Sequence, residues 1–114
     1  MEIRITGKNL SVTTGIRDWV QKKVSKLEKY VPRLESHVII KKEKYFYIAE
    51  ITASAKHLRA FGEGRDKDNL YTAIDWACDR LTKQLKKFRE KVKSHHLPVK
   101  GKQRQLSAEE EESE

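Results

Sequence analysis

The feature that most constrains the fold is an apolar stripe in the second half of the chain. Apolar residues recur there at steps of three or four, which places them on one side of a single long helix: Leu70, Ile74, Cys78, Leu81, Leu85, Phe88 and Val92. Asp68 or Asn69 can cap this helix at its N-terminus. An amphipathic helix is stabilised mainly by packing of its apolar side, so the rest of the chain has to supply a partner surface.

A second apolar stripe of the same kind lies nearer the N-terminus. From Ile16, apolar residues recur at steps of four, four, three and four: Val20, Val24, Leu27 and Val31. Pro32 cannot continue a helix, and Thr13 or Thr14 can cap its start. The pattern predicts a first helix that ends close to Val31.

The remaining ordered segments have the composition of β-strands. Residues 2–6, EIRIT, alternate between apolar and polar side chains before the turn sequence GKN. Residues 37–42, 47–55 and 58–64 are rich in β-branched and aromatic residues and are separated by short polar turns. These three runs predict a meander of antiparallel strands.

The predicted order is strand, helix, strand, strand, strand, helix, which indicates an α+β domain. We expect one four-stranded, mostly antiparallel sheet with both helices packed on one of its faces. The length of 114 residues and 37% apolar content suit a single small domain. We place this domain at residues 1–95 and expect residues 96–114 to be a disordered acidic tail, because they lack an apolar period.

The charge of the chain is unevenly distributed along its length. The whole chain carries a formal net charge of +8, whereas residues 101–114 contain two basic and five acidic residues, a net −3. The first hundred residues therefore carry +11. An excess of this size on a small domain attracts polyanions, and nucleic acid is the polyanion we expect as partner.

Basic residues form a ridge along each predicted helix. On the second helix they follow one another at steps of three and four, about 120° from the apolar stripe: Arg80, Lys83, Lys87 and Lys91. On the first helix the equivalent residues are Lys22, Lys26 and Lys29, with Arg33 one turn further and Lys23 at the flank. Like charges at this spacing oppose helix formation mildly, so a ridge without acids suggests a binding surface.

The ridges favour a phosphate-binding surface over an ordinary solvated surface. If the helices lie side by side on the sheet, their ridges can border one groove that accepts phosphates. Lysine binds phosphate as a point charge and does not read bases, so we expect specificity to come from the shape of a folded RNA. Arg33 and Arg80 have the geometry for bidentate phosphate or guanine contacts.

Aromatic residues offer an alternative way of binding RNA. Tyr45, Tyr47 and Phe61 could stack on bases from the open sheet face, although strand aromatics more often serve packing. Trp19 and Trp76 flank the apolar stripes, and we expect them to form the rim of the core.

The sequence gives little support for an enzyme. His95 and His96 have no ligand or acid–base partner at helical spacing, and Cys78 lies on an apolar stripe, where a buried thiol is usual. Asp75 and Asp79 could hold magnesium at an RNA interface, but charge balance is the commoner role. We therefore expect no catalysis, no cofactor, no metal site and no small-molecule substrate.

Nothing in the sequence predicts a membrane protein. No stretch approaches the ~20 apolar residues of a membrane-spanning helix, and the first residues lack a basic start with an apolar run. Cys78 is the single cysteine, which suits a reducing compartment. We expect a cytoplasmic protein.

Three stretches of the chain resemble the short-type ribosome hibernation factors, the group of the ribosome-associated inhibitor (protein Y) and hibernation-promoting factor. They are ITGKN at residues 5–9, IRDWVQKKVSKLEKY at 16–30 and NLYTAIDWACDRLTKQLKKF at 69–88. The resemblance covers residues 1–93. It implies a β-α-β-β-β-α fold similar to double-stranded RNA-binding domains.

The resemblance also implies a function and a set of contact residues. Members of this family occupy the small ribosomal subunit where messenger RNA and transfer RNAs would lie, which silences and protects idle ribosomes during stress or stationary phase. The family's rRNA-contacting residues correspond here to basic residues of both helices: Lys22, Lys23, Lys26, Lys29, Arg80, Lys83, Lys86, Lys87 and Lys91.

The C-terminal extension resembles that of one subtype. Members with an acidic extension hold single ribosomes, whereas members without one favour inactive ribosome dimers, and LSAEEEESE at 106–114 resembles the first kind. The alternatives are a factor that promotes ribosome dimers and a protein that modulates an alternative sigma factor. We expect the free protein to be a monomer.

Overall fold

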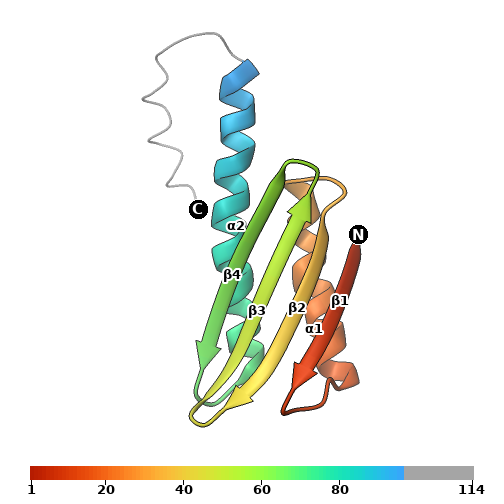
Figure 1. Ribbon diagram of the computed structural model, residues 1–114, viewed down its shortest axis with the longest axis vertical. Helices are drawn as coiled ribbons and strands as arrows, with labels where there is room; N and C mark the ends of the chain where they lie inside the picture. The colour runs from red at the N-terminus through yellow and green to blue at the C-terminus, as the bar shows by residue number, and fades with distance from the viewer. Residues whose placement is uncertain (97–114) are drawn as a thin grey trace.

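The computed structural model describes residues 1–96, with side chains to Glu90. The elements follow the predicted order: β1 (Glu2–Lys8), α1 (Thr14–Ser25), the short 3₁₀ helix η1 (Lys26–Lys29), β2 (Glu35–Glu43), β3 (Phe46–Ala55), β4 (Leu58–Asp66) and α2 (Leu70–His96). The β-α-β-β-β-α fold is therefore confirmed (Figure 1). Apart from His96, the predicted acidic tail lies outside the described residues.

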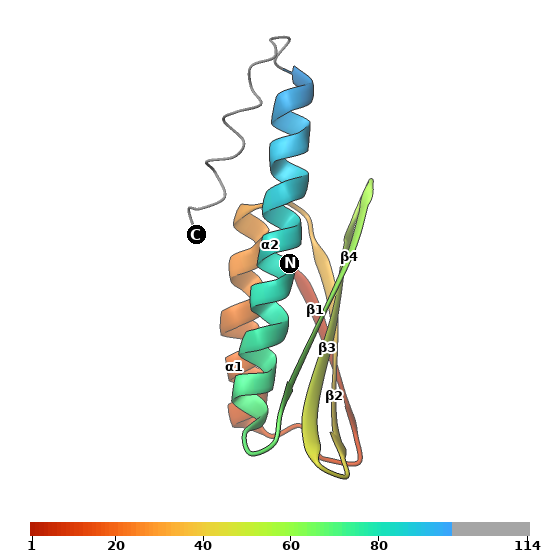
Figure 2. The ribbon, with the colours of Figure 1, turned by 90° about the vertical axis from the view of Figure 1, so that its left-hand side faces the viewer.

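The four strands form one twisted sheet in the order β1-β2-β3-β4. β1 runs parallel to β2, with Ile5 opposite Val38, while β2, β3 and β4 pair as an antiparallel meander. Both helices cover the same face of this sheet, and the other face carries no helix (Figure 2). The molecule thus has two layers, one of strands and one of helices.

The core lies between these two layers. The sheet contributes alternate residues of its inner face, such as Val38, Ile40 and Ile51, because side chains in a strand alternate between faces. The predicted apolar stripes of the two helices pack onto them, with Val20, Val24, Ile74, Leu81 and Leu85 fully buried. No helix in residues 1–96 is long and apolar enough to span a bilayer.

Side chains cap both helices as their sequences predicted. The Thr13 hydroxyl accepts a hydrogen bond from the Ile16 amide at 3.1 Å, and the Asn69 side-chain oxygen accepts one from the Tyr71 amide at 2.8 Å. The Asp66 carboxylate accepts from the amides of Asp68 and Asn69 at 3.0 and 2.8 Å. These bonds satisfy backbone donors and turn the chain from β4 into α2.

The first helix is shorter than the sequence indicated. The α-helix ends at Ser25, and the chain continues as the tighter 3₁₀ helix η1, in which the Tyr30 amide donates to the Leu27 carbonyl at 3.0 Å. The apolar spacing did not reveal this change because Leu27 and Val31 are buried in either geometry. Arg33 lies in the following turn with φ 60°, so it does not continue the helical ridge.

Two glycines allow α2 to approach β4 closely. A Cβ atom at Gly62 would lie 2.6 Å from the Ala77 carbonyl oxygen, and one at Gly64 would overlap the Ala73 carbonyl oxygen. Ala73 and Ala77 are themselves small and fully buried. Small residues on both sides therefore bring the backbone of the helix against the edge strand.

We predict that Gly64→Ala lowers the free energy of unfolding by about 2–3 kcal/mol, because the added methyl group meets backbone that cannot rotate away. Urea denaturation measures the loss. Gly15→Ala is the matched control, since its Cβ would meet side-chain hydroxyls, those of Tyr71 and Thr13, and no backbone, and alanine favours the exposed first turn of α1. Equal stability of the two variants would contradict tight packing at Gly64.

Cys78 is buried in the groove between the helices, as its place on the apolar stripe indicated. Burial raises the pKa of its thiol to about 12, and the nearby Asp75 carboxylate adds to this rise. The thiolate is the reactive form, and it is scarce wherever the pH lies well below the pKa.

We therefore predict that Cys78 in the native protein reacts with a disulfide reagent at pH 8 about a thousandfold more slowly than in urea, where the thiol has its ordinary pKa. Spectrophotometric release of the reagent's chromophore gives both rates. A native rate close to the rate in urea would show that the thiol is accessible.

Candidate nucleic-acid interface

The basic residues of the first helix divide between exposed and paired positions. Lys22, Lys26 and Lys29 are exposed, whereas Lys23 is half-buried. The Lys23 ammonium lies 3.8 Å from an Asp75 carboxylate oxygen and 5.0 Å from the centre of the Trp19 ring. Lys23 thus already has partners within the molecule.

Trp19 and Asp75 join the two helices beside Lys23. The Trp19 indole N–H donates a hydrogen bond to Asp75 Oδ1 at 2.9 Å, and the Trp19 ring packs edge-on against Tyr71 with centroids 5.4 Å apart. Trp19 therefore belongs to the rim of the core, as predicted. Its bond also holds the Asp75 carboxylate toward α1.

A groove lies between α1 with η1 and α2, with a volume of about 230 Å³. Lys23, Lys26 and Lys29 line one wall, whereas the wall from α2 carries Asp75 and Asp79. We expected the basic ridges of both helices to border one groove, and this expectation was wrong. The packing of α2 on β4 sets which side of the helix faces α1, and that side carries the acidic residues.

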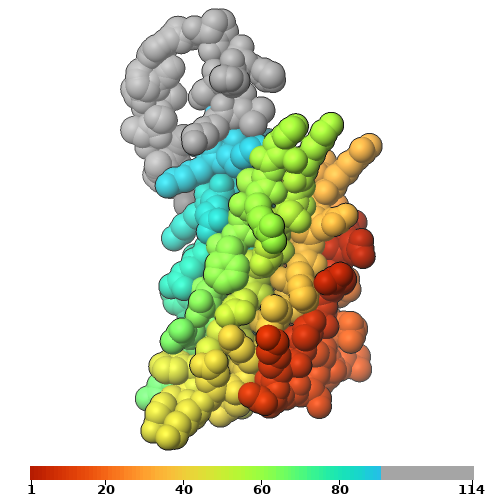
Figure 3. Space-filling view, viewed as in Figure 1, coloured from red at the N-terminus to blue at the C-terminus, as the bar shows by residue number. Residues whose placement is uncertain are grey.

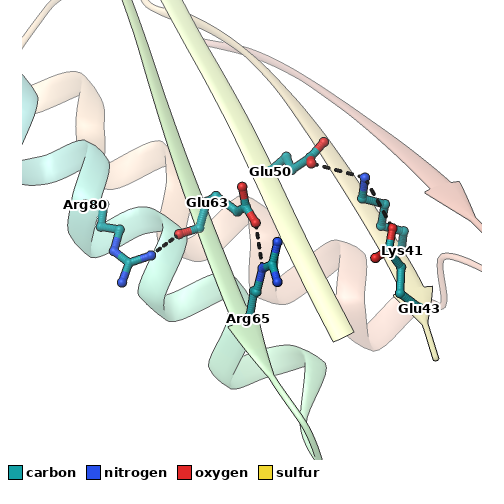
Figure 4. Close-up of polar contacts among 6 residues, drawn as sticks. All are labelled: Lys41, Glu43, Glu50, Glu63, Arg65 and Arg80. Atoms are coloured by element: carbon teal, nitrogen blue, oxygen red, sulfur yellow. Dashed lines mark hydrogen bonds and ion pairs between the residues drawn. The ribbon is translucent and has the colours of Figure 1, made fainter. Parts of the chain in front are cut away.

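The basic ridge of α2 lies on another side of the helix, away from α1. Arg80 reaches β4, where its guanidinium donates a hydrogen bond to the Glu63 carbonyl at 2.6 Å (Figure 4). Lys83 and Lys87 are exposed, and Lys83 lies 3.7 Å from the Asp79 carboxylate one turn earlier. Lys86 is half-buried, and the side chain of Lys91 lies outside those that the structure describes.

Arg80 and Gln84 together cover the backbone of the edge strand. The Gln84 amide accepts from the Phe61 N–H at 3.3 Å and donates to the Phe61 carbonyl at 2.6 Å, two residues before the Arg80 contact at Glu63. Residues four apart in a helix rise about 6 Å and residues two apart in a strand about 6.7 Å, so the two spacings match. Arg80 therefore has a structural role that the sequence did not indicate.

The helical layer carries most of the charge excess of the residues whose side chains the structure describes. Residues 14–29 and 70–90 contain ten basic and five acidic residues. Arg17 and Arg89 belong to this surface as exposed side chains, although the ridge pattern did not include them. Counting basic residues per helix, without requiring a ridge, would have found both.

The open face of the sheet, by contrast, has no net charge. By strand register it carries five basic and five acidic residues: Arg4, Lys8, Lys41, Arg59, Arg65, Glu2, Glu35, Glu43, Glu50 and Glu63. Several of them pair, such as Lys41 with Glu50 at 3.1 Å and Arg65 with Glu63 at 2.9 Å (Figure 4). Figure 3 shows this face, where side chains of all four strands lie side by side.

The three strand aromatics do not share a surface. Tyr47 packs against the core from the inner face, Phe61 is 49% exposed on the open face, and Tyr45 lies in the turn between β2 and β3. The structure therefore does not bring them together as a stacking platform. Trp76 is 50% exposed on α2, so our expectation that it forms the core rim was wrong.

Comparison with known proteins places the chain in a family. The family model described as Sigma 54 modulation protein / S30EA ribosomal protein matches residues 3–93. Proteins named ribosome hibernation promoting factor from Klebsiella oxytoca and Escherichia coli K12 are 37% and 36% identical over 98 residues, which make up 83% of this chain and all of each relative.

Solved structures agree with this placement. The N-terminal domain of Thermus thermophilus Protein Y matches with a TM-score of 0.72 and 37% identity, over 77% of this chain and 99% of that chain. A ribosomal subunit interface protein from Coxiella burnetii has the same fold, with a TM-score of 0.69 at 21% identity over 79% of this chain and 99% of its own. The chain therefore belongs to the Sigma 54 modulation protein / S30EA ribosomal protein family, the hibernation-factor group that its sequence motifs indicated.

Proposed function

We propose that this protein is a ribosome-associated hibernation factor. It binds rRNA of the small subunit at the messenger and transfer RNA sites, without catalysis, and so silences and protects idle ribosomes in the cytoplasm. Its relatives from Klebsiella oxytoca and Escherichia coli, named ribosome hibernation promoting factor, support the ribosome as the partner.

The observation that carries the proposal is the difference in charge between the two layers. The helical layer has twice as many basic as acidic residues, whereas the open sheet face is balanced and internally paired. A polyanion approaching this molecule is therefore attracted more strongly to the helical layer than to the open sheet face. The helical layer therefore contacts rRNA, and the sheet faces away.

The basic residues contribute to this surface unequally. Among the described side chains, Lys22, Lys26, Lys29, Lys86 and Lys87 form no ion pair with an acidic residue, so they meet phosphates at little internal cost. Lys23 and Arg80 would have to exchange contacts with Asp75 and Glu63 for contacts with RNA. Arg33 and Lys91 extend the surface at its ends in this proposal.

Asp75 and Asp79 give the surface a further property. They lie in the groove between the helices, opposite the lysines of α1 and η1, and make the α2 wall of the groove unfavourable for phosphates. RNA phosphates then meet the lysines of α1 and η1 and, separately, the basic ridge of α2. A surface of this shape suits a folded RNA with two separate backbone segments better than a single strand lying in one groove.

We predict that Lys83→Glu with Lys87→Glu weakens binding to purified small subunits and relieves inhibition of translation. If the two lysines neutralise one phosphate each, the slope of log affinity against log salt falls by about 1.4–1.8. Sedimentation with subunits at several salt concentrations measures it. The unchanged protein should sediment with ribosomes of a stationary-phase lysate.

The matched control for that experiment is Lys44→Glu with Lys56→Glu. It changes the net charge by the same amount in exposed turns of the sheet layer. Circular dichroism checks that both variants fold. Equal binding by the two double variants would remove the α2 ridge from the mechanism, and absence of the unchanged protein from ribosome fractions would refute the proposal as a whole.

We further propose that the acidic tail selects single ribosomes over ribosome dimers. The tail at 96–114 carries five glutamates near its end, and in this proposal their charge acts where two ribosomes would meet. The alternative is that this protein promotes ribosome dimers.

Deletion of the residues after Leu97 should leave small-subunit binding largely intact and raise the fraction of paired ribosomes. Sucrose-gradient profiles of cells carrying either form give that fraction. A tail of the same length with its glutamates replaced by glutamine separates the effect of charge from that of length. An unchanged ratio of single to paired ribosomes in both variants would contradict this role.

The family description itself supports a second candidate function, because it names modulation of sigma 54. Binding to a sigma factor would rest on protein contacts and would depend little on salt. The salt series described above therefore separates the two candidates, since phosphate contacts give a steep slope.

A further inference from the structure

Trp76 is a large apolar side chain that the fold does not need as core. It is 50% exposed, and it belongs neither to the buried core cluster nor to the partly buried residues that pack against it. Trp19, the other tryptophan, packs on Tyr71 and donates its N–H to Asp75. The two indoles therefore have different environments, one structural and one open to solvent.

The position of Trp76 on α2 continues the basic ridge. Residues 76, 80, 83 and 87 follow one another at steps of four, three and four, so they share one side of the helix. Trp76 begins this row, one turn before Arg80. Lys83 lies about 10 Å from Trp76 along the helix axis. An exposed aromatic ring thus lies at the end of a row of cations.

The Trp76 ring lies beside Arg80, the first cation of the row. Its Cβ lies over Gly64 of β4, where a glycine leaves room for it. The Arg80 guanidinium lies 5.8 Å from the ring centre, and the same guanidinium is bonded to the Glu63 carbonyl. Arg80 is therefore fixed at two points, and it restricts the indole from one side.

We propose that Trp76 is a stacking platform for an unpaired nucleotide base of the RNA that Arg80, Lys83 and Lys87 hold. This inference rests on the proposed function and names a further contact in the same surface. Every nucleobase has an apolar face that stacks on an indole, and stacking does not depend on base identity. The neighbouring lysines are placed to bind the phosphates of the same strand.

RNA fits this surface better than a protein partner does. Exposed tryptophans also anchor protein interfaces, but such interfaces are depleted in lysine. Here Arg80 lies beside the ring, and the same side of the helix continues with Lys83, which pairs with Asp79, and Lys87. An RNA strand can place one base on the Trp76 ring and its neighbouring phosphates on the lysines, so it contacts both the aromatic and the cationic side chains of this surface.

The first test is the affinity of Trp76→Ala for purified small ribosomal subunits at several salt concentrations. Loss of one stacked base corresponds to an affinity about 5- to 150-fold lower. The salt slope should not change, because no phosphate contact is removed. Trp76→Phe should keep most of the affinity, since it keeps an aromatic face.

Phe61→Ala is the matched control, because Phe61 has nearly the same exposure, 49%, on the opposite layer. Both alanine variants should fold, since alanine keeps the Cβ over Gly64 and neither ring is in the buried core. Equal affinity of Trp76→Ala and Phe61→Ala would overturn the stacking role. Normal binding by the lysine double variant would remove the α2 ridge from the mechanism, and absence of the wild-type protein from ribosome fractions would refute the proposed function, so these failures are distinguishable from loss of the stacking role alone.

The second test identifies the partner of the ring. In a Trp19→Phe background, Trp76 is the single tryptophan, and its fluorescence should be quenched by small subunits. A photoreactive phenylalanine analogue at position 76 should form a crosslink to rRNA that ribonuclease removes. A crosslink to a ribosomal protein, or no quenching at saturating subunits, would overturn contact with a base.

Discussion

The close contact between α2 and β4 determines the arrangement of the whole helical layer. Gly62 and Gly64 present bare backbone to Ala73 and Ala77, so the helix axis lies nearer to the edge strand than larger side chains would permit. This contact fixes the rotation of α2 about its axis. As a result Arg80 reaches β4, and the basic ridge turns away from the groove between the helices.

The same rotation gives the molecule its uneven charge surface. The carboxylates of α2 face α1, where Asp75 binds both Trp19 and Lys23 and ties the two helices together. The basic ridge of α2 therefore lies outside the groove, while the open sheet face balances its charges, in part through the pairs Lys41 with Glu50 and Arg65 with Glu63. Like charges within one ridge oppose folding only mildly, and the core between the layers outweighs them.

Much of the fold could be predicted from the sequence because its elements differ in hydrophobic period. Steps of three and four marked α2, alternation marked the strands, and Asn69 capped the second helix as expected. The spacing could not distinguish an α-helix from the 3₁₀ turn η1, since Leu27 is buried in both. The basic residues that the sequence named as the candidate site stay a prediction. The acidic wall of the groove was not predicted, because a periodic pattern leaves open which neighbour each side of a helix faces.

By itself, the sequence determined the order of the elements, which side of each helix is apolar, the excess of positive charge and, through its motifs, the family. Only the tertiary structure decided how the charged sides are oriented relative to one another. It placed acids between the helices, gave Arg80 a backbone partner on β4 and left Trp76 exposed in line with the lysines. The physical reason is that the rotation of a helix is set by the side chains and glycines it packs against, and these come from strands distant in the chain.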